Sequence, residues 1–284
     1  MPNAPELAVT GSTGHLGGLV ARLLAAAGSR QRLLVRDSAR APDLEGAVPF
    51  VTTYADQERT KAALVGATTL FMVSAAEAED RLQQHYAFVD AAAAAGVRHI
   101  VYTSFFGAAP DSTFTLGRDH FATEERIKAS GMDYTFLRDN FYLDFLPLLA
   151  GEDGVIRGPA GDGVMAAVAR ADVARSAVTV LRDPALHVRR TYDLTGPENI
   201  SLARGAELLT AGTGRAITFH NETLEEAYAS RASFGAPPWQ VDAWVSTYTA
   251  IAAGELAGPT SAVHELTGRE PLSLEQFLAE AHTL

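Results

Sequence analysis

The chain has 284 residues, with 23 Lys and Arg against 34 Asp and Glu and a formal net charge of −11. It contains no cysteine, which excludes disulfide scaffolds, thiol nucleophiles, thiolate zinc sites and iron–sulfur clusters. Because 47 % of the residues are hydrophobic and 20 % are charged, the chain can bury a core. The negative net charge opposes binding to the phosphate backbone of nucleic acids. No basic cluster offsets it, because the only adjacent basic pair is Arg189–Arg190.

No targeting or membrane signal stands out. The first residues lack a basic segment followed by a long apolar one. The longest alanine tract, residues 91–95, is too short to span a bilayer. We therefore expect a cytoplasmic protein that binds neither membrane nor nucleic acid.

Short apolar runs alternate with helical patterns through the first half of the chain. The predicted strands cover residues 7–10, 32–35, 48–52, 69–73, 98–103 and 134–138. The predicted helices between them cover residues 14–27, 56–65, 79–95 and 118–130. Asp56 is the expected N-cap of the second helix, and Gly131 ends the fourth. Strands that are apolar on both faces and alternate with helices indicate an α/β fold, a Rossmann-type doubly wound parallel sheet.

The pattern changes after about residue 145. The glycine-rich segment 151–163 predicts a loop or short hairpin, and Asp172 predicts the cap of a helix to residue 181. A short strand is expected at 192–195, followed by helices at 202–211, 224–231, 239–253 and 274–281. We predict a dinucleotide-binding core over residues 1–150. A smaller, mainly helical substrate-binding portion would cover residues 151–284, with strands near residues 165 and 192 returning to the core.

The first strand runs into a glycine-rich loop with the spacing G-x-x-G-x-x-G. Such a loop brings bare backbone N–H groups to the positive end of a helix, where a pyrophosphate can approach without meeting a Cβ. Its position after a strand and before a helix is the context that a dinucleotide site requires. The expected cofactor contacts are Gly11, Ser12, Thr13, Gly14, His15, Leu16 and Gly17.

The end of the second strand bears on which dinucleotide binds. A carboxylate at this place suits the ribose of NAD, whereas an arginine suits the 2′-phosphate of NADP. Arg36 comes first and Asp37 follows, with Arg40 one helical turn further on. A guanidinium is the natural bidentate partner of a phosphate, so NADP is favoured and Asp37 leaves NAD open.

The chain lacks the tyrosine–lysine pair with which many short-chain dehydrogenases move a proton. Four residues before Lys61 stands Gln57, and four before Lys128 stands Glu124. No Tyr-x-x-x-Lys motif exists, so alcohol dehydrogenation or epimerisation of that type is not expected.

Several motifs together resemble one family. They are residues 11–18 (GSTGHLGG), 101–104 (VYTS), 131–142 (GMDYTFLRDNFY), 158–163 (GPAGDG) and 170–174 (RADVA). In this order the chain resembles the NmrA-like atypical short-chain dehydrogenases, and within them the bacterial NADPH:quinone oxidoreductases, with triphenylmethane reductase as a relative. The resemblance covers nearly the whole chain and is weakest in the last quarter.

The resemblance implies further site residues. Ser74 and Ala75 match the loop beside the cofactor riboses, and Asn140, Phe141 and Tyr142 match the segment that closes over nicotinamide and substrate. Thr103 and Ser104 lie at the carboxyl end of the fifth strand, where ligands gather in such sheets. NADP is the implied cofactor, with no flavin and no metal. A homodimer is left open.

His120 stands where plant reductases of the wider family carry a catalytic lysine, and the bacterial branch resembles this chain in having histidine there. A histidine can donate a proton near neutral pH, but a structural role for a histidine at the start of a helix is an equal alternative. His120 and Asn140 are the candidate catalytic residues.

The resemblance implies hydride transfer from NADPH to a quinone or a similar conjugated acceptor. That reaction needs positioning and exclusion of water more than a strong acid. Aromatic side chains could form a flat substrate pocket, or could pack in the core: Phe105, Phe106, Phe141, Phe145 and Trp239. The alternative function is a non-catalytic regulatory protein that senses NADP.

Overall fold

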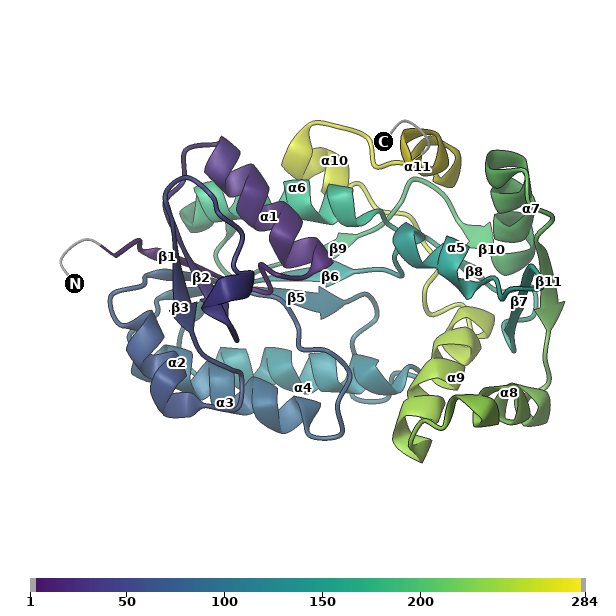
Figure 1. Cartoon of the computed structure of the whole chain (residues 1–284), viewed down its shortest axis with the longest axis horizontal. Helices are drawn as coiled ribbons and strands as arrows, with labels where there is room; N and C mark the ends of the chain where they lie inside the picture. The colour runs from purple at the N-terminus through teal and green to yellow at the C-terminus, as the bar shows by residue number, and fades with distance from the viewer. Residues whose placement is uncertain (1–3, 282–284) are drawn as a thin grey trace. The chain divides into compact units, whose positions relative to one another are not determined.

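The computed structural model describes residues 4–281 of the chain (Figure 1). These residues form two compact units. Unit 1 comprises the chain up to Ser104 together with Asp119–Arg138 and Val173–Tyr192. Unit 2 comprises Phe105–Arg118, Asp139–Asp172 and the chain from Asp193 onward. The units interleave along the sequence instead of dividing at residue 150.

The central sheet has seven strands within the described residues, in the order β3-β2-β1-β4-β5-β6-β9. Their bounds are β1 Leu7–Thr10, β2 Gln31–Val35, β3 Ala47–Val51, β4 Thr69–Met72, β5 His99–Phe105, β6 Asp133–Asp139 and β9 Arg190–Leu194. The pairings from β3 to β5 are all parallel. This is the strand order of a Rossmann fold, in which the winding direction reverses between β1 and β4. The predicted fold class is confirmed.

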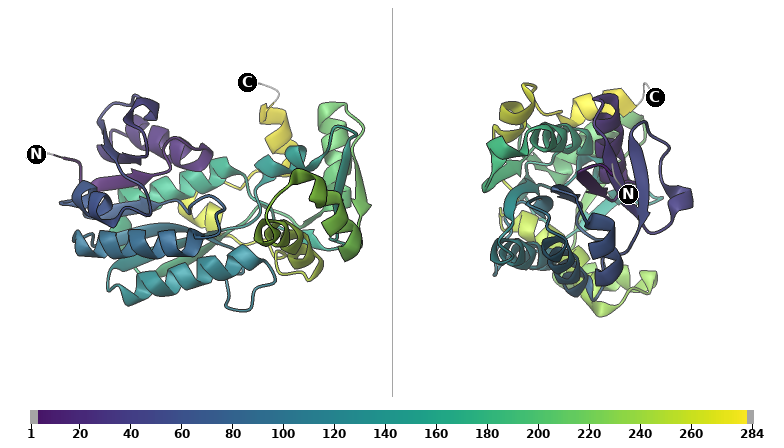
Figure 2. Two further views of the ribbon diagram at one scale, coloured as in Figure 1. Left: turned by 60° about the horizontal axis from the view of Figure 1, so that its bottom comes forward. Right: turned by 90° about the vertical axis from the view of Figure 1, so that its left-hand side faces the viewer.

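Helices cover both faces of this sheet (Figures 1 and 2). One face carries α1 (His15–Ala26) and α6 (Arg170–Arg182), and the other carries α2 (Gln57–Leu64), α3 (Arg81–Ala94) and α4 (Thr115–Ala129). The inner strands β1, β2, β4 and β5 are largely buried on both sides, whereas the edge strand β3 is mostly exposed. Double-sided burial explains why the strands read as continuous apolar runs in the sequence.

The predicted helix ends are confirmed in two places and wrong in a third. Asp56 caps α2, since its Oδ1 accepts the N–H of Arg59 at 3.0 Å. Gly131 follows α4 with φ +80°. Asp172 lies inside the first turn of α6, where its Oδ2 accepts the N–H of Leu272 at 2.9 Å. Helix α6 begins at Arg170, two residues before Asp172, because Asp144, distant in sequence, accepts the N–H of Arg170 at 3.0 Å.

Unit 2 contains two small sheets and most of the remaining helices. β7 (Val155–Gly158) pairs in parallel with β11 (Thr218–Asn221), and β8 (Val164–Met165) pairs antiparallel with β10 (Ile200–Ser201). The helices of unit 2 are α5 Leu146–Leu149, α7 Leu202–Thr213, α8 Leu224–Arg231, α9 Pro238–Ala252, α10 Ala262–Thr267 and α11 Leu274–Ala281. Short 3₁₀ turns occur in both units: η1 Ser38–Arg40, η2 Leu143–Phe145, η3 Pro184–His187 and η4 Ala232–Phe234.

One expectation for this region holds in part and another is corrected. The segment 151–163 begins with a tight turn closed by an antiparallel bridge between Ala150 and Ile156, and its strand β7 also pairs with β11, some 60 residues away. The strand near residue 165 pairs with β10 and not with the central sheet, whereas the strand near residue 192 is β9 of that sheet. Strands of two to four residues carry too little periodicity to reveal a distant partner.

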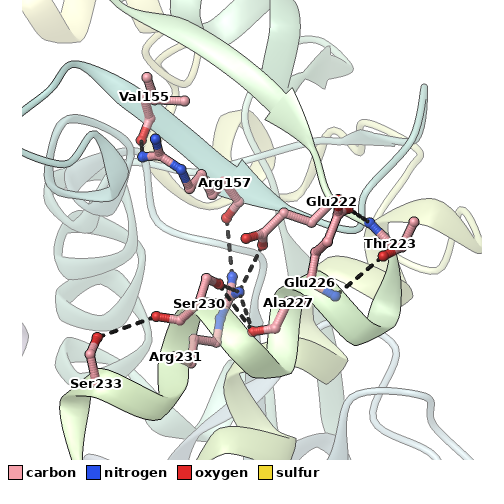
Figure 3. Close-up of polar contacts among 9 residues, drawn as sticks. All are labelled: Val155, Arg157, Glu222, Thr223, Glu226, Ala227, Ser230, Arg231 and Ser233. Carbon is pink, nitrogen blue, oxygen red and sulfur yellow. Dashed lines mark hydrogen bonds and ion pairs between the residues drawn. The ribbon is translucent and has the colours of Figure 1, made fainter.

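Arg231 fixes α8 to β7 inside unit 2 (Figure 3). Its Nη1 donates to Oε2 of Glu222 and to the carbonyl oxygen of Ala227, each at 2.8 Å. Its Nη2 donates to the carbonyl oxygen of Arg157 at 3.1 Å. Both charged side chains of this ion pair are buried. The guanidinium thus satisfies a buried carboxylate and two backbone carbonyls at once.

Arg231→Leu is expected to lower the free energy of unfolding by about 3–5 kcal/mol, because it leaves Glu222 buried without its partner. A urea titration followed by circular dichroism measures the change. Arg157→Leu is the control, since it breaks an exposed ion pair with Asp153 and a long hydrogen bond to the Val155 carbonyl oxygen, and should change stability little. Equal losses in the two variants would contradict this account.

Candidate cofactor site

The loop between β1 and α1 depends on glycine for its close backbone packing. Gly11 has φ +66°, and its carbonyl oxygen accepts the N–H of Gly14 at 2.9 Å. A Cβ on Gly17 would lie 2.4 Å from the carbonyl carbon and oxygen of Gly11. No side chain fits between the first turn of α1 and the loop, so the helix approaches the end of β1 through bare backbone.

The positive end of α1 is open for an anion. Gly14 is the N-cap and supplies no side-chain hydrogen bond, and the first turn holds no acidic residue. Ser12 is 3 % exposed, and among residues 4–281 its Oγ has no hydrogen-bond partner. Thr13, His15 and Leu16 complete the loop and the first turn. An uncapped helix end with a buried, unsatisfied hydroxyl beside it fits a pyrophosphate.

The two charged residues at the end of β2, Arg36 and Asp37, differ in their contacts. Oδ1 of Asp37 accepts the N–H of Ala39 at 2.9 Å and caps the 3₁₀ turn η1. Arg36 is exposed, and no hydrogen bond or ion pair within the described part of the chain holds its guanidinium. The Asp37 carboxylate is therefore engaged locally while the Arg36 guanidinium remains available.

The hydroxyl groups of Thr103 and Ser104 bond to neighbouring elements of unit 1. Oγ1 of Thr103 accepts the N–H of Ser74 at 2.8 Å. Oγ of Ser104 donates to Oε1 of Glu124 at 2.6 Å, and this buried carboxylate also receives both arms of Arg138 at 2.7–2.8 Å. Thr103 and Ser104 thus lie at the expected end of β5, where their side chains hold the strand ends in place.

His120 lies in a buried network, and both of its ring nitrogens have partners. Nη2 of Arg81 donates to its Nε2 at 2.9 Å, and Oη of Tyr102 lies 2.9 Å from its Nδ1. Since arginine only donates, Nε2 is the acceptor, and the proton of the neutral ring sits on Nδ1. Burial, reinforced by the Arg81 charge, lowers the pKa of His120 well below its ordinary value of 6.5. The imidazole is neutral at neutral pH, which favours a positioning role over proton donation.

The segment after β6 belongs to unit 2. Nδ2 of Asn140 donates to the carbonyl oxygen of Leu256 at 3.0 Å, while its Oδ1 accepts the N–H of Phe141 at 2.7 Å. Oη of Tyr142 donates to Oδ2 of Asp139 at 2.7 Å. Because both ends of its amide are used, Asn140 shapes the backbone of this segment.

Asp139 is a chemically distinctive residue that the sequence interpretation passed over. Its Oδ1 has no hydrogen-bond partner within residues 4–281. Burial raises the pKa of this carboxyl group to about 8, against the lowering effect of the Tyr142 hydrogen bond. In the sequence, Asp139 is only an acidic residue directly after a predicted strand, a pattern that is equally typical of an exposed loop.

The aromatic candidates all lie in unit 2. Phe105, Phe106 and Phe141 are partly buried and pack against its hydrophobic core. Phe145 is 38 % exposed and contacts Phe141 and Tyr142, with ring centroids 5.9 Å apart in each pair. Trp239 is half-buried in the first turn of α9. Phe141, Tyr142 and Phe145 therefore form one aromatic group, while Phe105 and Phe106 serve packing.

Residues 4–281 offer neither a metal site nor a membrane-spanning helix. No three His, Asp or Glu side chains gather closely enough to hold a metal ion. None of the helices described has the length and apolar character needed to cross a membrane.

Comparison with known proteins agrees with this geometry. The NAD(P)H-binding family matches residues 11–184. The chain is 33 % identical to NAD(P)H azoreductase of Xenophilus azovorans over 96 % of both chains, and 32 % identical to quinone oxidoreductase 2 of Escherichia coli over 96 % of this chain and 97 % of that one.

Solved structures give the same result. The NADPH complex of the Escherichia coli quinone oxidoreductase has a TM-score of 0.88 at 31 % identity and covers 97 % of this chain and 99 % of its own. The NADP(H) complex of triphenylmethane reductase from Citrobacter sp. has a TM-score of 0.85 at 30 % identity, with the same coverage.

The Rossmann-type sheet and the matches to NAD(P)H-dependent enzymes define a dinucleotide-binding oxidoreductase. The chain belongs to the NAD(P)H-binding family and is an NAD(P)H-dependent oxidoreductase related to quinone oxidoreductase and azoreductase. It shares its fold with NmrA, at a TM-score of 0.76 and 16 % identity.

Proposed function

We propose that the chain uses NADPH to reduce quinones or similar conjugated aromatic acceptors. The observation that carries the choice of cofactor is the pair at the end of β2, where Asp37 caps a turn and Arg36 stays available. The acceptor class is supported by the similarity to a quinone oxidoreductase and an azoreductase over nearly the whole chain.

The residues have distinct tasks in this proposal. The backbone of residues 11–17 and Oγ of Ser12 hold the pyrophosphate, and Arg36 holds the 2′-phosphate. Bound NADPH would supply a hydride, which reduces a quinone to the hydroquinone monoanion, a stabilised phenolate that water protonates. No Tyr-x-x-x-Lys pair is present in the sequence, and none is needed for such a product. Ser74, Ala75, Thr103 and Ser104 shape the site edge, and His120 and Asn140 position neighbouring groups.

Phe141, Tyr142 and Phe145 are the favoured substrate contacts, because they form one aromatic group and Phe145 remains accessible. A flat conjugated acceptor could stack on such rings. The regulatory alternative needs the same phosphate loop but no acceptor contacts. The reductase names of relatives that match nearly the whole chain speak against it.

The test is the loss of NADPH absorbance after mixing the protein with a benzoquinone, a naphthoquinone and an azo dye. We expect oxidation of NADPH that depends on both protein and acceptor. Measured NADPH binding without oxidation across this panel would favour the regulatory alternative and contradict a reductase.

Arg36→Ala is expected to weaken NADPH binding by about 10- to 100-fold, because it removes charge-assisted hydrogen bonds to the 2′-phosphate. NADH lacks that phosphate, so its affinity should stay unchanged. Titration of each cofactor by fluorescence measures both constants. Arg59→Ala, which removes an exposed arginine on α2, is the control and should alter neither affinity. Equal weakening of NADPH and NADH would show that Arg36 does not contact the 2′-phosphate.

A further inference from the structure

Three consecutive backbone N–H groups follow β4, and each donates to a side chain from a different element. The N–H of Val73 donates to Oγ1 of Thr10 in β1 at 2.8 Å. The N–H of Ser74 donates to Oγ1 of Thr103 in β5 at 2.8 Å, and the N–H of Ala75 donates to Nε2 of His85 in α3 at 2.9 Å. The backbone of residues 73–75, here called the 73–75 segment, is thus held by side chains where the strand ladder has ended.

Helix α3 contacts both polar backbone groups of Ala75. Nε of Arg81 donates to the carbonyl oxygen of Ala75 at 3.0 Å, and His85 accepts its N–H. Arg81 and His85 are four residues apart and lie on the same face of α3. The remaining nitrogens of Arg81 bond to Asp119 and His120, which fixes the direction of its side chain.

The buried His85 is neutral and holds its proton on one definite nitrogen. Because Nε2 accepts from the backbone, the proton sits on Nδ1, which donates to Oγ1 of Thr123 at 2.9 Å. The Thr123 hydroxyl in turn donates a hydrogen bond to the carbonyl oxygen of Asp119 at 2.7 Å. Burial and the Arg81 charge lower the pKa of His85 well below 6.5, so the accepting form is the one present at neutral pH.

The 73–75 segment adjoins the phosphate loop. A Cβ on Gly11 would lie 3.1 Å from Cβ of Val73, so the Val73 side chain packs directly against the backbone of Gly11. The winding of the sheet reverses between β1 and β4, and dinucleotides bind at such a reversal, beyond the carboxyl ends of the strands. A displacement of the 73–75 segment would therefore alter one wall of the cofactor crevice.

We propose that His85, together with Arg81, is a positioning residue for the cofactor: it fixes the 73–75 segment against the phosphate loop before NADPH binds. This inference rests on the proposed function. It assigns a role to a buried histidine that touches no reacting atom.

Two conservative variants test whether His85 acts through its hydrogen bond with Ala75 or only by filling space in the core. In His85→Gln the side-chain amide reaches the position of Nε2 and can still accept the Ala75 N–H. In His85→Asn the shorter amide reaches only the position of Nδ1, so it can bond to Thr123 but leaves the Ala75 N–H without an acceptor. Gln84→Asn, at a partly exposed neighbour on α3, is the matched control.

The measurements are the NADPH dissociation constant by calorimetry and, without NADPH, hydrogen exchange of the Ala75 amide by NMR. We expect His85→Asn to weaken NADPH binding about tenfold and to accelerate Ala75 exchange, whereas His85→Gln stays within about threefold of the parent protein. Thermal unfolding checks that each variant folds. If both variants have the same affinity and the same Ala75 exchange as the parent, the positioning role is wrong. If the parent protein itself does not bind NADPH, the proposed function is wrong instead.

Discussion

Gly17→Ala should weaken NADPH binding by at least about 100-fold, the equivalent of about 2.7 kcal/mol. The added methyl group would lie 2.4 Å from backbone atoms of Gly11 and 2.6 Å from the carbonyl oxygen of Thr10. No side-chain rotation can relieve this overlap, because its partners are backbone atoms. The first turn of α1 must move away from β1, and its N–H groups then no longer converge on the pyrophosphate.

A matched substitution controls for the change of residue type. Gly205 lies inside α7, where an added Cβ would have only Ile200 Cγ2 nearby, at 3.9 Å. Gly205→Ala should therefore stabilise the fold by about 0.5–1 kcal/mol, as expected for alanine in a helix, and leave NADPH affinity unchanged. Calorimetric titration of NADPH into both variants tests the pair. Unimpaired binding in Gly17→Ala would mean that the close approach of α1 to the loop does not shape the site.

Asp139→Asn should stabilise the protein at pH 8 by an amount on the order of 2–5 kcal/mol. Burial raises the pKa of Asp139 to about 8 in the folded chain, against an ordinary value of 3.8. Between these pH values the unfolded state loses a proton that the folded state keeps. The free energy of unfolding therefore falls as the pH rises from about 4 to 8. Asparagine keeps an oxygen for the Tyr142 hydroxyl and has no charge to bury.

Urea titrations of Asp139→Asn and the parent protein at pH 5 and pH 8 measure this effect. The two proteins should differ more at pH 8 than at pH 5. Asp153→Asn is the control: the Arg157 hydrogen bond lowers the pKa of Asp153 to about 2, so this exposed carboxylate is ionised in both states throughout the range. Its variant should keep the parent's dependence on pH. An equal stability difference at both pH values would contradict a neutral Asp139.

Local patterns in the sequence predicted the fold class and the phosphate loop. The seven residues from Gly11 to Gly17 are contiguous, so their glycine spacing alone places them between a strand and a helix. The capping role of Asp56 is equally local, since its acceptor and donor are three residues apart. The prediction that Asp172 caps α6 was wrong because the hydrogen-bond acceptor at the start of that helix is Asp144, which no local sequence pattern can reveal.

The positioning residues of the site could not be found in this way. Arg81 and His85 occupy ordinary positions in a helical pattern, and their meaning comes from contacts with Ala75, His120 and Thr123. His120 was recognised through resemblance, yet its protonation state depends on burial and on the Arg81 charge. Such properties arise from segments brought together by folding.

The division of the chain into interleaved units has a consequence for gene architecture. Unit 1 draws its residues from three separate stretches, the last of which carries most of α6 and the start of β9. A gene fragment that stops at residue 150 would therefore encode an incomplete cofactor unit, and the complementary fragment would lack Phe105 and Asp139 of unit 2. A single recombination point therefore cannot exchange one whole unit for its counterpart in a related gene.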